Sequence, residues 1–154
     1  MTAYLHKYTV IMLSMAMGNA DFWAYKIAPG RKGSRMIRII IVDNEPAVRK
    51  GLRLLLGAET DMEVVGEAGD GPDALLLCQA LSPDVALLDV QMPHMDGLAV
   101  AEALRVTCPA THVFLLTFHD DARTRAQAAE AGAGLISKQA APGETLSAIR
   151  SVAC

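Results

Sequence analysis

Residues 85–97 read VALLDVQMPHMDG, and this stretch is the most informative part of the sequence. Its first four residues are apolar and suit a strand that is buried on both faces, but the apolar run ends on a carboxylate, Asp89. An unpaired charge at the edge of a core is costly, so an acid at this point needs a reason. Open α/β sheets bind ligands at the carboxyl ends of their strands. Asp89 is therefore the first candidate functional residue.

On both sides of this stretch, from Met36 onward, strand patterns alternate with helix patterns. The predicted strands are 37–42, 62–68, 84–89, 112–116 and 134–137. The predicted helices are 46–57, 71–81, 98–107, 120–131 and 142–152, and Gly57 is expected to cap the first of them. This alternation predicts an α/β fold, a five-stranded parallel sheet covered on both faces by five helices. The alternation alone leaves the strand order open.

Composition and charge limit the possible functions. The chain has 154 residues, of which 52% are hydrophobic and 20% are charged, as expected for a globular protein. Residues 1–35 hold five Lys/Arg and one Asp, whereas residues 36–154 hold nine Lys/Arg and sixteen Asp/Glu. An acidic body is a poor match for nucleic acid, so we expect no direct nucleic-acid binding. Three scattered cysteines indicate reduced thiols and a cytoplasmic location.

The change of charge also suggests a boundary. We expect residues 1–35 to be an N-terminal extension outside the domain and residues 36–154 to form the domain. The apolar stretch 8–17 is too short to span a membrane, which needs about 20 apolar residues. The open alternatives are a loosely packed extension, an interfacial anchor that uses Trp23, and a true start of translation at Met36.

Polar residues follow several of the predicted strands, and parallel strands bring these ends to one edge of the sheet. The residues are Asp43, Asn44, Asp89, Thr117 and Lys138. Taken singly, Asp43 could be a helix cap, Thr117 a loop hydroxyl and Lys138 a solvated charge. Taken together, two acids and a backbone carbonyl suit Mg²⁺, and a hydroxyl and an ammonium can hold phosphoryl oxygens. A carboxylate can also act as a nucleophile.

The segments VDNEP at 42–46, LLDVQMPHMDG at 87–97, LT at 116–117 and SK at 137–138 together carry a family resemblance. Over residues 36–153 the chain resembles the receiver domains of two-component response regulators, of the NarL/FixJ type. The resemblance implies a doubly wound, flavodoxin-like fold with strand order 2-1-3-4-5. It also implies that Asp89 accepts a phosphoryl group from a histidine kinase. Slow self-dephosphorylation, rather than enzymatic turnover, would then remove this group.

The resemblance further assigns expected roles to the polar edge. The Mg²⁺ ligands would be the oxygen donors Asp43, Asn44, Asp89 and the main-chain oxygen of Gln91. Thr117 and Lys138 would bind the phosphoryl group, and Leu135 occupies the position of the conformational switch. The implied partners are a histidine kinase and a possible second copy of the chain. No output domain follows before Cys154, so the sequence leaves open a stand-alone receiver or a regulator that has lost its output domain.

Three residues, Asn44, Leu135 and Gln139, depart from the family pattern, and the first two define an alternative. Asn44 stands where the family usually has a second acid, which removes one negative charge from the metal site. Leu135 stands where an aromatic residue usually reports the switch. Both favour a pseudo-receiver, an interaction module that does not cycle phosphate. A haloacid-dehalogenase-like phosphatase would need a second acid two residues after its nucleophile, and Gln91 at that position argues against it.

Overall fold

The computed structural model describes residues 35–153, and residues 1–34 and Cys154 lie outside the described residues. The strands in this part of the chain are β1 (Ile37–Val42), β2 (Met62–Ala68), β3 (Val85–Asp89), β4 (His112–Thr117) and β5 (Gly134–Ser137). The helices are α3 (Pro46–Gly57), α4 (Gly71–Leu81), α5 (Gly97–Thr107), α6 (Ala122–Glu130) and α7 (Pro142–Val152). Each predicted strand and helix is therefore present.

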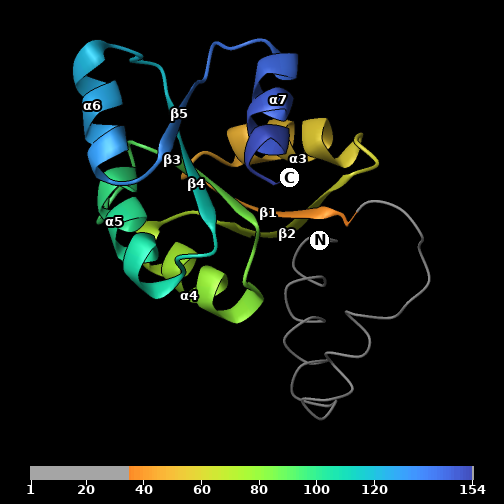
Figure 1. The fold of residues 1–154 in the computed structure, drawn as a ribbon, viewed down its shortest axis with the longest axis horizontal. Helices are drawn as coiled ribbons and strands as arrows, with labels where there is room; N and C mark the ends of the chain where they lie inside the picture. Colours follow the sequence, from red (N-terminus) through yellow and green to blue (C-terminus); the bar gives the residue numbers. More distant parts are fainter. Residues whose placement is uncertain (1–34, 154) are drawn as a thin grey trace. The chain divides into compact units, whose positions relative to one another are not determined.

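The five strands form one parallel sheet. Their order is β2-β1-β3-β4-β5, which confirms the order that the family resemblance implies. Helices α3 and α7 cover one face, α4 and α5 cover the other, and α6 packs beside β5 (Figure 1). Asp89 pairs with Leu116, and Thr117 pairs with Ser137. This register aligns the carboxyl ends of β3, β4 and β5, where the candidate residues lie.

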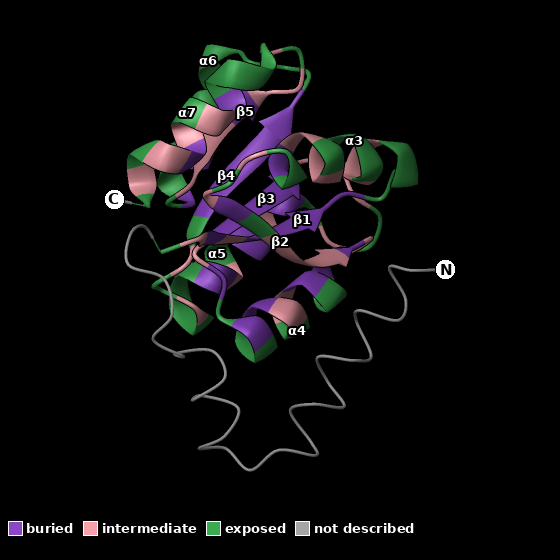
Figure 2. Ribbon diagram, turned by 90° about the vertical axis from the view of Figure 1, so that its right-hand side faces the viewer, coloured by how far each residue is buried: buried purple, intermediate pink, exposed green. Residues whose placement is uncertain are grey.

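The core is centred on β1 and β3, two adjacent strands inside the sheet. Residues 39–42 and 85–88 have no exposed surface, and Figure 2 shows the middle of the sheet as a continuous buried layer. On one side of the sheet, Leu56 of α3 and Ile149 of α7 pack against this layer. Burial of an Ile or Leu side chain contributes about 1.5–3 kcal/mol relative to its exposure. The apolar strands thus fix the positions of the acids at their ends.

Aspartate caps explain why two helices begin away from their predicted starts. Helix α5 begins one residue earlier than expected, and α6 begins two residues later. The side chain of Asp96 accepts a hydrogen bond from the amide of Ala99 at 2.8 Å, and Asp121 accepts one from the amide of Thr124 at 2.8 Å. Because a capping residue stands just outside its helix, these two aspartates set the first helical residue.

The end of α3 corrects a prediction. Gly57 was expected to cap this helix, but it is the last helical residue, and Ala58 takes the C-cap position with a right-handed backbone. The amide of Ala58 donates to the carbonyl of Leu56, so the helix ends in a tight turn. This ending needs no left-handed residue, and therefore no glycine cap.

The predicted boundary at residue 35 stays a prediction, because residues 1–34 lie outside the described residues. Arg35 is described, and its exposed guanidinium pairs with Asp84 at 2.6 Å. Within residues 35–153, no helix combines the length and the apolar character that crossing a membrane requires.

Gly97 lets α5 start directly against the end of β3. Its amide donates to the carbonyl of Val90 at 3.0 Å, and a Cβ at this position would overlap the carbonyl oxygen of Asp89. Backbone atoms cannot move aside as a flexible side chain can. The loop between β3 and α5 therefore depends on the absence of a side chain at residue 97.

We predict that Gly97→Ala lowers the free energy of unfolding by about 1–3 kcal/mol, the usual range for overpacking. The matched control is Gly51→Ala in α3, where a Cβ meets nothing within 4 Å. That change should raise the free energy of unfolding by up to about 1 kcal/mol, because alanine favours a helix interior. Urea unfolding followed by circular dichroism measures both. Equal stability of the two variants would contradict the close approach at Gly97.

Candidate functional site

The structure brings four of the predicted site residues together. We call Asp43, Asp89, Thr117 and Lys138 the carboxyl-edge cluster. Asp43 has no exposed surface, Asp89 and Thr117 are each 5% exposed, and the side chain of Lys138 is 9% exposed. These residues come from the ends of β1, β3, β4 and β5, which are far apart in the sequence. The parallel sheet therefore assembles a buried polar group at one edge, as the strand-end pattern predicts.

Lys138 joins the two acids of the cluster. Its Nζ lies 3.0 Å from Oδ2 of Asp43 and 3.0 Å from Oδ1 of Asp89. Its backbone amide donates to the carbonyl of Thr117 at 2.7 Å, which fixes the residue beside β4. Two carboxylates and one ammonium leave this group with a formal charge of −1.

This charge balance perturbs the ionisation of Asp89. Burial raises the pKa of the Asp89 carboxyl, repulsion from Asp43 adds to the rise, and the hydrogen bond from Lys138 opposes it without cancelling it. Burial alone would lower the pKa of Lys138, but its hydrogen bonds to Asp43 and Asp89 outweigh burial and raise that pKa. The ammonium is thus held charged, while the carboxylate that shares it stays incompletely compensated.

Backbone amides hold each acid in place. Oδ1 of Asp43 accepts a hydrogen bond from the amide of Glu45 at 2.8 Å, which shapes the turn into α3. Oδ1 of Asp89 accepts one from the amide of Gln91 at 3.2 Å. In each case the acid is bonded to the loop that follows its own strand. Neither carboxylate is free to swing away from Lys138 without loss of such a bond.

The remaining predicted site residues lie around the cluster. The hydroxyl oxygen of Thr117 accepts a hydrogen bond from the amide of His119 at 2.9 Å. Asn44 and Gln91 are exposed in the loops that follow β1 and β3. Leu135 is half-buried on β5 and pairs with Leu115 of β4. The acids, the hydroxyl and the lysine therefore lie together. The two further oxygen donors, Asn44 and Gln91, are one and two residues after the acids in the sequence.

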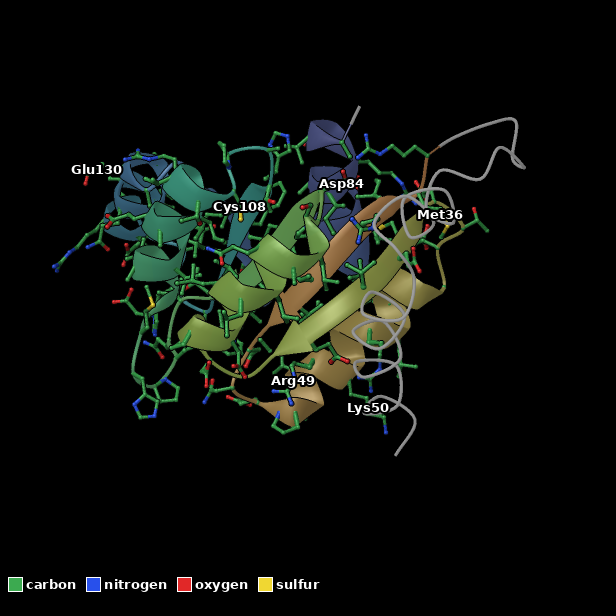
Figure 3. All side chains as sticks on the ribbon, turned by 90° about the horizontal axis from the view of Figure 1, so that it is seen from below. Met36, Arg49, Lys50, Asp84, Cys108 and Glu130 are labelled. Carbon is green, nitrogen blue, oxygen red and sulfur yellow. The ribbon has the colours of Figure 1, made fainter. Side chains whose placement is uncertain are left out.

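The structure adds two residues that the sequence reasoning did not single out. The guanidinium of Arg49 donates to the carbonyl of Asp43 at 2.6 Å, and Figure 3 shows Arg49 at the opposite end of the sheet from Met36 and Asp84. The ring of Phe118 lies with its centroid 5.2 Å from Nζ of Lys138. Phe118 directly follows Thr117, so adjacency was a usable signal for it. Arg49 sits within a helix and gave no such signal.

The donor set fits a hard divalent cation in chemistry. The carboxylates of Asp43 and Asp89, the amide oxygen of Asn44 and the main-chain oxygen of Gln91 are the oxygen ligands that Mg²⁺ prefers. The raised pKa of Asp89, with repulsion from Asp43 as one cause, indicates that these acids lack positive charge. Among residues 35–153, however, no group of three or more His, Cys, Asp or Glu side chains is placed to hold a metal ion. Asn44 and Gln91 would supply neutral oxygens, so the donor set holds two acids.

A cavity of about 200 Å³ lies away from the cluster, at the other end of the sheet. Its lining includes Arg35, Asp84 and His112, at the starts of β1, β3 and β4. Strand-start residues of an open α/β sheet are not where such sheets bind their ligands. The chemistry of the carboxyl-edge cluster, rather than the size of this cavity, therefore locates the candidate site.

Comparisons with known proteins agree with this fold. The chain is 41% identical over 118 residues to the uncharacterized transcriptional regulatory protein YxjL of Bacillus subtilis, and 39% identical over 118 residues to the response regulator UvrY of Escherichia coli K12. Each match covers 76% of this chain and 54% of the relative. The chain thus spans about half the length of these relatives.

Solved structures give the same answer. The signal receiver domain of the putative response regulator NarL from Mycobacterium tuberculosis superposes with a TM-score of 0.74 at 39% identity, covering 77% of this chain and 97% of that domain. The response regulator domain of Thermotoga maritima CheB superposes with a TM-score of 0.72 at 27% identity, with the same two coverages. The family model of the response regulator receiver domain matches residues 39–150. The chain therefore belongs to the response regulator receiver domain family.

Proposed function

We propose that this receiver domain acts in two-component signalling by accepting a phosphoryl group on Asp89 from the phosphohistidine of a histidine kinase. The observation that carries the proposal is the bridge of Lys138 between Asp43 and Asp89 at 3.0 Å each. A buried carboxylate at a strand end, with an ammonium in contact, is a nucleophile with charge compensation at hand. Because the chain belongs to the receiver family, a histidine kinase is the expected partner.

The proposed step is a direct phosphoryl transfer. One oxygen of the Asp89 carboxylate forms a bond to phosphorus, and the bond between phosphorus and the histidine nitrogen breaks. The electron pair of the broken bond stays on the imidazole of the kinase, which takes a proton from solvent. Asp89 then carries an acyl phosphate. Because the protein contributes mainly position and charge to such a transfer, the geometry of the cluster is what matters.

Lys138 and Thr117 would respond to the new group. The ammonium of Lys138 already contacts Asp89, so it can compensate phosphoryl oxygens that appear at that carboxylate. The hydroxyl of Thr117 donates to the carbonyl of His119 at 3.5 Å, and it would give up this bond in order to donate to a phosphoryl oxygen. That exchange would move the chain after β4 and transmit the change. Leu135 would respond by packing, since it has no polar group to offer.

Asp43, Asn44, Asp89 and the main-chain oxygen of Gln91 would hold Mg²⁺ in this proposal. A bound divalent cation supplies charge neutralisation for the transferred group. Asn44 contributes a neutral oxygen where an acid would add a charge, so we expect weak metal binding. The guanidinium of Arg49 lies at the carbonyl of Asp43 on this side of the cluster, but it also pairs with Glu67 at 3.8 Å, which balances its charge. The neutral Asn44 is therefore the feature that lowers the attraction for a cation.

The neutral residue at position 44 also supports an alternative, a pseudo-receiver that keeps the fold but does not cycle phosphate. The specific observations in its favour are Asn44 where the family usually has an acid and Leu135 where it usually has an aromatic residue. The two functions differ in whether Asp89 can be phosphorylated. A homodimer, slow self-dephosphorylation, a cytoplasmic location and the lack of direct nucleic-acid binding by this chain stay predictions under either function.

We predict that acetyl phosphate with Mg²⁺ phosphorylates the chain on Asp89 and on no other residue. Transfer breaks the bond between phosphorus and the acetate oxygen and releases acetate. Borohydride trapping followed by mass spectrometry locates the acyl phosphate. Asp89→Asn should abolish the labelling, while Asp73→Asn, a change at an exposed acid of α4, should keep it. Labelling that survives Asp89→Asn would refute the assignment, and no labelling of the natural chain would favour the pseudo-receiver.

We predict that Asn44→Asp tightens Mg²⁺ binding about tenfold or more, because one added charge near a divalent cation exceeds the roughly 1.4 kcal/mol that tenfold requires. Amide NMR shifts of residues 43–45 and 89–91, followed during a Mg²⁺ titration, give the affinity. The control Gln79→Glu adds the same charge on an exposed residue near the end of α4 and should change the affinity little. Unchanged or weaker binding in Asn44→Asp would exclude residue 44 as a ligand.

A further inference from the structure

Phe118 is an exposed aromatic residue beside a buried charge. Its surface is 58% exposed, and its ring centroid lies 5.2 Å from Nζ of Lys138. A cation within about 6 Å of an aromatic centroid is attracted to the negative face of the ring. Exposed single aromatics need no explanation by themselves. The short distance between the ring of Phe118 and the ammonium of Lys138 is what indicates a role for this residue.

The ammonium of Lys138 can contact the ring of Phe118 in addition to its two acids. Its ammonium carries three N–H donors, and the carboxylates of Asp43 and Asp89 each lie 3.0 Å from Nζ. The side chain is only 9% exposed, so little water is available to it. An aromatic face attracts an ammonium without offering it a proton acceptor. The ring of Phe118 therefore adds to the enclosure of the cation without competing for the two acids.

The backbone holds Phe118 and Lys138 near each other. Thr117 pairs with Ser137 at the ends of β4 and β5, so residues 118 and 138 directly follow the ends of adjacent strands. The amide of Lys138 donates to the carbonyl of Thr117 at 2.7 Å, and the amide of His119 donates to the Thr117 hydroxyl oxygen at 2.9 Å. These two bonds fix the chain on both sides of Phe118. The contact between ring and ammonium is thus built into the sheet edge.

We propose that Phe118 is a positioning residue for Lys138, whose ammonium its ring holds between Asp43 and Asp89. This inference rests on the proposed function, in which Lys138 compensates the phosphoryl group on Asp89. A charge that is already oriented before the transfer needs no reorganisation during it. Without the ring, the ammonium would be more mobile and more hydrated. The aromatic face, rather than apolar bulk, is the property that matters.

The test compares three variants of the full chain. Phe118→Leu keeps an apolar side chain but removes the aromatic face, and Phe118→Tyr restores the face. Val106→Ala removes an exposed apolar group from α5 and serves as the control for surface changes. The first measurement is the NMR shift of the Lys138 side-chain methylene protons next to Nζ. The second is the initial rate of Asp89 phosphorylation by acetyl phosphate with Mg²⁺.

We expect an upfield ring-current shift of these methylene protons in the natural chain, in Phe118→Tyr and in Val106→Ala, and its loss in Phe118→Leu. The phosphorylation rate should fall about two- to fivefold in Phe118→Leu, as a contact of 0.5–1 kcal/mol implies, and Phe118→Tyr should restore it. A purely apolar role would instead leave Phe118→Leu as active as the natural chain.

Three results would overturn the proposal: no upfield shift in the natural chain, a rate in Phe118→Tyr as low as that in Phe118→Leu, or a faster rate in Phe118→Leu. The last result would mean that the ring obstructs the phosphodonor. If the natural chain shows the shift but takes up no phosphoryl group, the proposed function fails, whereas the positioning of Lys138 is supported by the shift. The two proposals can therefore fail separately.

Discussion

The ammonium of Lys138, held between the carboxylates of Asp43 and Asp89, is the interaction on which the rest of the site depends. Each ion buried without compensation costs several kcal/mol, and Asp43 is fully buried. One ammonium cannot fully compensate two carboxylates, and burial, with repulsion from Asp43 added to it, leaves the pKa of Asp89 raised. The site is therefore stable enough to form and yet short of positive charge. Such an arrangement favours partners that bring a cation.

The fold produces this interaction because its apolar strands end on polar residues at one edge of the sheet. The continuous apolar runs that end at Asp43 and Asp89 were sufficient to predict β1 and β3, and the prolines and glycines between elements set most helix bounds. Strand order was not predictable from alternation, because helices on either face permit several orders, and it came only from the family resemblance. The starts of α5 and α6 were missed by one and two residues, because Asp96 and Asp121 cap the helices from outside.

The candidate site was predictable to the extent that parallel strands end at one edge. That rule placed Asp43, Asp89, Thr117 and Lys138 together before any distance was known. It could not give the sharing of one ammonium by two acids or the ring of Phe118 over Lys138. These depend on side-chain distances between residues up to 95 positions apart in the chain. The contact of Arg49 with the Asp43 carbonyl was equally hidden, since a helical arginine has many possible partners.

The most direct test of this account is the pH dependence of stability for the natural chain and Asp89→Asn, measured without phosphodonor in a chelating buffer. Because the folded pKa of Asp89 is raised, its stabilising contribution is fully present below the unfolded value of about 3.9 and is lost as pH rises through the folded pKa. Asparagine does not titrate. We therefore predict that the unfolding free energy of Asp89→Asn, relative to the natural chain, rises as pH increases from the unfolded to the folded pKa of Asp89 and then levels off. A relative free energy that stays flat or falls would show that Lys138 compensates Asp89 fully, and would contradict the account.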